Sequence, residues 1–78
     1  MTSGRPADAG GWHSWRLRGT EVRVAARQLD RPMILDSLMG MDYGQAGDWL
    51  VKNAHDELHI VPAEQFDVLY EYQAEAAV

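Results

Sequence analysis

The sequence has no cysteine and no long apolar segment, and both absences limit what the chain can be. Without cysteine there is no disulfide and no thiolate metal cluster, so the stability of 78 residues must come from apolar packing or from association. The apolar runs are only a few residues long, whereas a membrane-spanning helix needs about 20. The start of the chain also lacks the apolar core of a signal peptide, so we expect a cytoplasmic protein without membrane contact.

Basic residues are scarce after residue 31, where Lys52 is the only one. Residues 1–31 have a net charge of +3 because arginines outnumber acids, whereas residues 32–78 have a net charge of −8. This asymmetry favours basic strands that lie beside acidic strands of the same sheet or of a neighbouring copy. The overall charge of −5 disfavours nucleic acid as a partner, because an acidic protein repels phosphates at long range.

Composition divides the chain into three parts. Residues 1–11 are small and polar with Gly and Pro, which predicts a disordered leader. Residues 12–72 alternate between apolar and polar side chains and form a single small β domain, and residues 73–78 are expected to be a frayed tail.

Period-2 alternation on both sides of Gly19-Thr20 predicts two strands joined by a two-residue turn. This register places Trp15 opposite Val24. It also places Arg16 opposite Arg23, a like-charge pair that calls for an acidic neighbour.

The middle of the chain is less regular. Residues 33–38 are apolar and fit either a buried strand or a short helix, because β-branched residues are few. Residues 40–48 have three glycines and two aspartates, which predicts a loop or a pair of turns.

Residues 49–61 form the clearest pattern, a hairpin with a four-residue loop over residues 53–56. In the register that matches charge with charge, Lys52 is opposite Glu57 and Trp49 is opposite Ile60. Pro62 to Phe66 suit a single helical turn with proline at its first position, and residues 68–72 alternate as a closing strand. We therefore predict a mainly β fold: a small, partly open β-barrel or a strongly bent antiparallel sheet of about five strands, with one short helical turn.

The segment Ala46-Gly47-Asp48-Trp49-Leu50-Val51 resembles the Gly-Asp-aromatic motif of the PGDYG family of small bacterial and phage proteins. The similarity extends to Ala26-Arg27-Gln28-Leu29, to the hairpin that ends near Pro62, and to Phe66 and Tyr70, and so covers roughly residues 16–72. Ala46 stands where the family name has Pro, and Trp49 where it has Tyr. The resemblance implies a small phage- or prophage-associated protein of unassigned role, with no reaction or ligand to transfer.

Few residues suggest catalysis or metal binding. His55 and His59 have the i, i+4 spacing of a zinc helix, but Asp56 stands where such a metalloprotease motif has Glu, and the alternation predicts a strand. The aspartates of residues 36–48 lack calcium-loop spacing, and Asp48 is expected to bind backbone amides at the mouth of the hairpin. His59 with Asp48 or Glu57 is the best remaining acid-base combination. We expect no catalytic residue, no metal and no cofactor.

Six large amphipathic aromatic side chains, three Trp and three Tyr, are many for so short a chain, and most of them should lie in the core. Trp12 and Tyr43 are the exceptions, because they fall in a leader and a loop and are free to anchor an interface. The expected function is a non-enzymatic interaction domain that binds a protein partner or a second copy. Alternatives are a weak single-stranded nucleic-acid binder through the Arg/Trp-rich first strands and, third, a metal-binding or enzyme-accessory protein. The candidate partner-binding residues are Trp12, Trp15, Arg16, Arg18, Arg23 and Tyr43.

Overall fold

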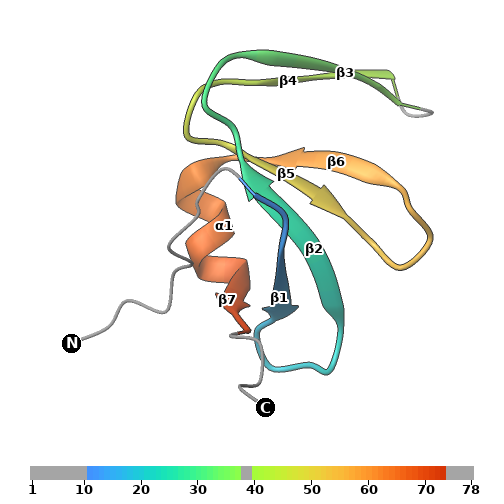
Figure 1. The fold of residues 1–78 in the computed structure, drawn as a ribbon, viewed down its shortest axis with the longest axis vertical. Helices are drawn as coiled ribbons and strands as arrows, with labels where there is room; N and C mark the ends of the chain where they lie inside the picture. Colours follow the sequence, from blue (N-terminus) through green and yellow to red (C-terminus); the bar gives the residue numbers. More distant parts are fainter. Residues whose placement is uncertain (1–10, 38–39, 74–78) are drawn as a thin grey trace.

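The computed structural model describes residues 11–37 and 40–73 (Figure 1). In chain order the elements are β1 (His13–Leu17), β2 (Arg23–Gln28), β3 (Met33–Ser37), β4 (Gly40–Gly44), β5 (Trp49–Lys52), β6 (Leu58–Val61), α1 (Ala63–Leu69) and β7 (Tyr70–Tyr72). Five strands form an antiparallel sheet in the order β6-β5-β2-β1-β7, and β3 pairs with β4 as a separate hairpin. The predicted mainly β fold is confirmed, and the sheet does not close into a barrel within the described residues. The predicted leader and tail lie almost wholly outside them.

The register of β1 and β2 is the predicted one, with Trp15 opposite Val24 and Arg16 opposite Arg23. The two-residue turn is wrong, because the amide of Arg18 donates to the Leu69 carbonyl at 2.8 Å instead of closing the turn. The chain turns one residue earlier, where the Thr20 amide donates to the Leu17 carbonyl at 3.1 Å. Gly19 has a φ of 78° in this turn, a conformation that glycine adopts without steric cost.

The hairpin of residues 49–61 exists, but its predicted register is wrong by one residue. Lys52 is opposite Leu58 rather than Glu57, and Trp49 is opposite Val61 rather than Ile60. The cause is the loop, in which Asp56 has a left-handed φ of 61° and Asn53 pairs with Glu57: the Asn53 amide donates to the Glu57 carbonyl at 3.1 Å. A left-handed residue at the end of a three-residue loop is a common hairpin connection, and it shifts the pairing by one position.

Residues 33–37 form a strand, which decides between the two predicted alternatives for the part that the structure describes. The predicted loop over residues 40–48 is wrong in its first half, because Gly40–Gly44 is the strand β4. At Gly44 the absence of a side chain lets the backbone of β4 lie close to Leu29 and Ile60. A Cβ atom added to Gly44 would lie 2.7 Å from Leu29 Cδ1 and 3.2 Å from Ile60 Cδ1, so a larger residue there would have to displace these side chains from the layer between hairpin and sheet.

The helix is longer than the single turn predicted for residues 62–66. Helix α1 continues to Leu69, so the prediction of a strand at Val68 is wrong, and only Tyr70–Tyr72 forms the closing strand. Two features explain the extension. Asp48 Oδ1 accepts a hydrogen bond from the Ala63 amide at the helix start at 3.1 Å, and Phe66 is completely buried. Burial of an apolar face stabilises a short helix more than its intrinsic propensity does.

The two faces of the sheet are covered by different elements. On one face α1 completes an aromatic layer, in which Phe66 stacks on Trp49 with ring centroids 4.0 Å apart and contacts Trp15 and Tyr70 at 4.7 and 5.0 Å. On the other face the β3–β4 hairpin contacts β6 and covers an aliphatic layer of Leu29, Leu50, Ile60 and the backbone of Gly44. In Figure 1 the hairpin lies at the top, above β5 and β6, and no other described element covers the outer side of β1 and β2.

Candidate interaction surfaces

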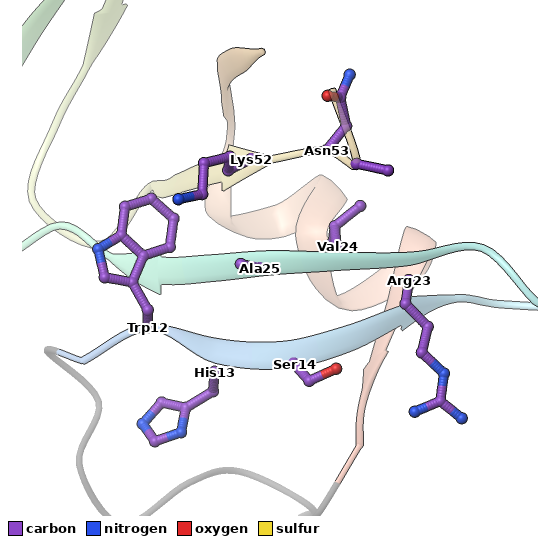
Figure 2. Close-up of a pocket in the computed structure, with 9 residues that line it drawn as sticks. Trp12, His13, Ser14, Arg23, Val24, Ala25, Lys52 and Asn53 are labelled. Carbon is purple, nitrogen blue, oxygen red and sulfur yellow. The ribbon is translucent and has the colours of Figure 1, made fainter. Parts of the chain in front are cut away.

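The uncovered part of the outer sheet face forms the first candidate surface, here called the basic face. Ser14 lies opposite Ala25, and Ala25 lies opposite Lys52, so three neighbouring strands contribute to one patch. The small side chains of Ser14 and Ala25 leave a shallow, open depression of about 380 Å³ (Figure 2). The basic face consists of Trp12, Ser14, Arg23, Ala25, Arg27 and Lys52.

Trp12 is the most prominent side chain of the basic face and is 43% exposed. Figure 2 shows its ring extending from the start of β1 across β2 toward Lys52. Lys52 Nζ lies 5.3 Å and Arg27 Cζ lies 5.9 Å from the ring centroid, both within cation–π range. These two contacts hold the indole against the sheet although much of it faces solvent.

The basic face has cations without matching acids. Arg16, on the same side of the sheet, is neutralised by Glu71 of β7 at 2.9 Å, and the same carboxylate lies 3.7 Å from Arg18. Glu71 is therefore the acidic neighbour that the Arg16–Arg23 pair calls for. By contrast, Arg23, Arg27 and Lys52 form no ion pair with a carboxylate in the part of the chain that the structure describes.

Asp30 lies near Arg27 but forms its ion pair with Arg31. The Arg31 side chain donates a hydrogen bond to it at 3.2 Å, and this bond, with the charge of Arg31, lowers the pKa of Asp30 below its usual value. Arg27 makes a smaller contribution to the same pKa shift. The positive charge of the basic face is therefore not cancelled by direct contact.

The second candidate surface is the outward side of the β3–β4 hairpin, here called the hairpin face. Ile34 lies opposite Tyr43, and Met41 lies diagonally beside them, opposite Asp36. These three apolar side chains are 62%, 70% and 54% exposed, while Gly44 and its neighbours on the other side of the hairpin face the sheet. The hairpin face, Ile34, Met41 and Tyr43, is thus an apolar patch that nothing in the described chain covers.

The structure separates the residues predicted to bind a partner. Trp12 and Tyr43 are exposed, as expected, but they lie on different surfaces. Arg23 belongs to the basic face, whereas Arg16 is paired with Glu71. Arg18 lies at the turn after β1, where its guanidinium donates to the Asp67 carbonyl oxygen at 3.1 Å.

The inclusion of Trp15 among the partner-binding residues is wrong. Its side chain is only 3% exposed and forms part of the aromatic layer. Sequence analysis also missed Arg27 and Lys52. Arg27 is four residues after Arg23 in the same strand, so alternation alone could have placed both on one face. Lys52 joins them only through the pairing of β5 with β2.

The residues considered for metal binding or catalysis are dispersed or engaged. His55 lies in the loop after β5, and His59 lies in β6 opposite Val51, so the two do not share a helix face. Asp48 binds the amides of Gln45 and Ala63 at 2.9 and 3.1 Å, which confirms its predicted role in the turn. Glu57 accepts a hydrogen bond from Asn53 Nδ2 at 2.8 Å.

Within residues 11–37 and 40–73, no group of three or more His, Asp or Glu side chains is arranged to hold a metal ion. The one helix in the described part of the chain is too short to cross a bilayer. No protein-family model, no curated protein and no solved structure matches this chain. The resemblance to the PGDYG family therefore stays a prediction.

Proposed function

We propose that this chain is a non-enzymatic interaction domain that associates weakly with a second copy of itself through the hairpin face. The supporting observation is the exposure of Ile34, Met41 and Tyr43 on one side of a hairpin whose other side packs against the sheet. Exposed apolar area on this scale, gathered on one flat surface, is typical of interaction sites.

A second copy is the occupant that the hairpin face fits best. Asp36 is the only charged side chain on the outward side of the hairpin in the described residues, so a partner needs apolar area more than opposite charge. A two-stranded hairpin is marginally stable alone, and covering its outer side stabilises it. In a two-fold dimer one apolar patch meets the same patch of the other copy, and both hairpins are covered at once.

The size of the hairpin face limits the affinity. Each strand has five residues, and at about 3.3 Å per residue the face is about 16 Å long. The face is only two strands wide, with strands about 4.8 Å apart, so its area is well below the roughly 800 Å² per partner of a standard stable interface. The dimer is therefore expected to be reversible and dependent on concentration, not permanent.

Hydrogen bonding of the polar residues supports the non-enzymatic part of the proposal. Asp48 and Glu57, the carboxylates considered as acid-base partners of His59, are used to shape a turn and a loop. These hydrogen bonds give both carboxylates a structural role, which accounts for their presence without catalysis.

Sedimentation velocity over a range of protein concentrations tests the proposal. The wild-type chain should shift from monomer to dimer as concentration rises, and high salt should preserve or strengthen the dimer because apolar contacts are not screened. The double variant Ile34→Thr/Tyr43→Ser should remain monomeric. Val68→Ser is the matched control, because Val68 is 70% exposed on α1, away from the hairpin. A wild-type monomer at all concentrations, or equal loss in the control, would contradict the proposal.

A further inference from the structure

We infer that the basic face is a second, separate binding site that takes a short single-stranded nucleic acid, with a base stacked on Trp12 and phosphates held by Arg23, Arg27 and Lys52. The inference uses none of the residues of the hairpin face and does not depend on self-association. It differs from the nucleic-acid alternative predicted from sequence, because Trp15, Arg16 and Arg18 are excluded and Arg27 and Lys52 are added.

Charge is the first argument. The chain as a whole is acidic, with a net charge of −5, yet Arg23, Arg27 and Lys52 gather on one side of the sheet without an ion pair in the described residues. Arg16 lies on the same side but differs from them, because it forms an ion pair with Glu71 at 2.9 Å. Cations that the fold leaves unpaired on an open surface are complementary to an anionic ligand.

The exposed indole is the second argument, and it favours nucleotides over acidic peptides. Trp12 is 43% exposed and borders a depression whose floor is formed by the small residues Ser14 and Ala25. An aromatic ring beside cations offers both contacts that a nucleotide needs, a surface for the base and a charge for the phosphate. An acidic peptide would use the cations but would leave the indole without a matching group.

The spacing of the cations is the third argument. Arg23 and Arg27 lie four residues apart on one side of β2, which is about 13 Å at about 3.3 Å per residue. Lys52 is opposite Ala25, midway between them on the neighbouring strand. Because the charged ends of Lys52 and Arg27 lie 5.3 and 5.9 Å from the Trp12 ring centroid, two cations gather beside the indole, and Arg23 lies farther along β2, where the next phosphates of an extended backbone would pass.

The test is fluorescence anisotropy of a labelled oligothymidine of about 10 nucleotides, a length within the site sizes of small β folds. The full chain should bind it at low salt, and three phosphate contacts predict a loss of about 20-fold in affinity between about 50 and 200 mM salt. Trp12→Ala should weaken binding by at least about fivefold, the lower limit for loss of one stacked base, while Trp12→Phe should retain most of it. Lys52→Gln should weaken binding and reduce the salt dependence.

Two controls make the result specific. Arg18→Gln removes the same charge from an exposed arginine outside the basic face, whose guanidinium donates to the Asp67 carbonyl oxygen, so it should bind almost as the wild type does. The double variant Ile34→Thr/Tyr43→Ser should bind normally, which separates this site from the hairpin face. Equal weakening by Arg18→Gln and Lys52→Gln would overturn the inference, because binding would then depend only on overall charge. Absence of binding, or competition by poly-glutamate as effective as that by unlabelled oligonucleotide, would also overturn it.

Discussion

The two layers on either side of the five-stranded sheet differ in what they bury and in what they leave exposed. The aromatic layer encloses Phe66 between Trp49, Trp15 and Tyr70, and all four side chains are buried. The aliphatic layer under the hairpin is thinner, and the hairpin that covers it exposes its own apolar outer side. The comparison indicates a division between the two sides: the aromatic layer holds most of the buried core, while the opposite side carries both candidate surfaces.

The largest effect is expected from breaking the aromatic layer with Phe66→Ala. Phe66 is fully buried, so the substitution removes a stacked ring and leaves a cavity. Deletions of this kind cost about 3–5 kcal/mol in the free energy of unfolding. Urea denaturation followed by tryptophan fluorescence measures the loss. Val68→Ala on the same helix is 70% exposed and should change the free energy by less than about 0.5 kcal/mol. Similar losses for both variants would show that the helix is not anchored by Phe66.

The next effect is expected from Gly44→Val, which forces the hairpin away from the aliphatic layer. The new Cβ would lie 2.7 Å from Leu29 Cδ1, and overpacking of this kind costs about 1–3 kcal/mol. Hydrogen exchange should show faster exchange in β3 and β4 with little change in β1 and β2. Adding Leu29→Ala relieves the overlap, so the double variant should lose less than the sum of the two single variants. Additive losses would mean that the cost of Gly44→Val does not arise from its contact with Leu29.

A smaller effect is expected from Asp48→Ala, because Asp48 links the two layers. Its carboxylate binds the Gln45 amide just after β4 and the Ala63 amide at the start of α1. Loss of a capping carboxylate costs about 1–2 kcal/mol, measured by urea denaturation. Asp48→Asn keeps one acceptor oxygen and should lose about half as much. If Asn is as destabilising as Ala, the charge of Asp48 matters more than its hydrogen bonds.

The smallest effect is a pH dependence from Tyr70. Burial raises the pKa of the Tyr70 hydroxyl above its ordinary value of 10.0, so the folded state favours the neutral phenol. This contribution to stability is complete below pH 10.0 and is lost as the pH rises through the higher pKa of the folded state. The free energy of unfolding of Tyr70→Phe should therefore decline less steeply than that of the wild type in the alkaline range. Parallel declines would show that other groups dominate alkaline unfolding.

Local patterns predicted the strands with clear alternation better than the glycine-rich segments. The Trp15–Val24 pairing followed from the alternation of residues around one turn, and it is confirmed. The strand Gly40–Gly44 was missed because glycine signals a turn when the sequence is considered alone, whereas Gly44 is required by the approach of Leu29 and Ile60. The register of the β5–β6 hairpin was missed because charge matching favoured Lys52 with Glu57, while the left-handed Asp56 decided the loop length.

The candidate surfaces depended even more on the tertiary structure. Exposure of Trp12 and Tyr43 was predicted from their positions outside the clearest strands and is confirmed. The basic face was not predicted as a unit, because Lys52 joins Arg23 and Arg27 only when β5 pairs with β2.

Composition and period-2 alternation are local properties of the chain, and they were enough to predict the mainly β class, the alternating faces of the first hairpin and the lack of disulfides. The side of the sheet that each side chain helps to cover, and the cations that have no carboxylate partner among the described residues, followed from the tertiary structure alone. Both depend on strand pairing and on the packing of α1 and the β3–β4 hairpin, and these bring together residues that are distant in sequence. The acidic total thus coexists with a basic face, since Glu71 reaches Arg16 but no described carboxylate forms an ion pair with Arg23, Arg27 or Lys52.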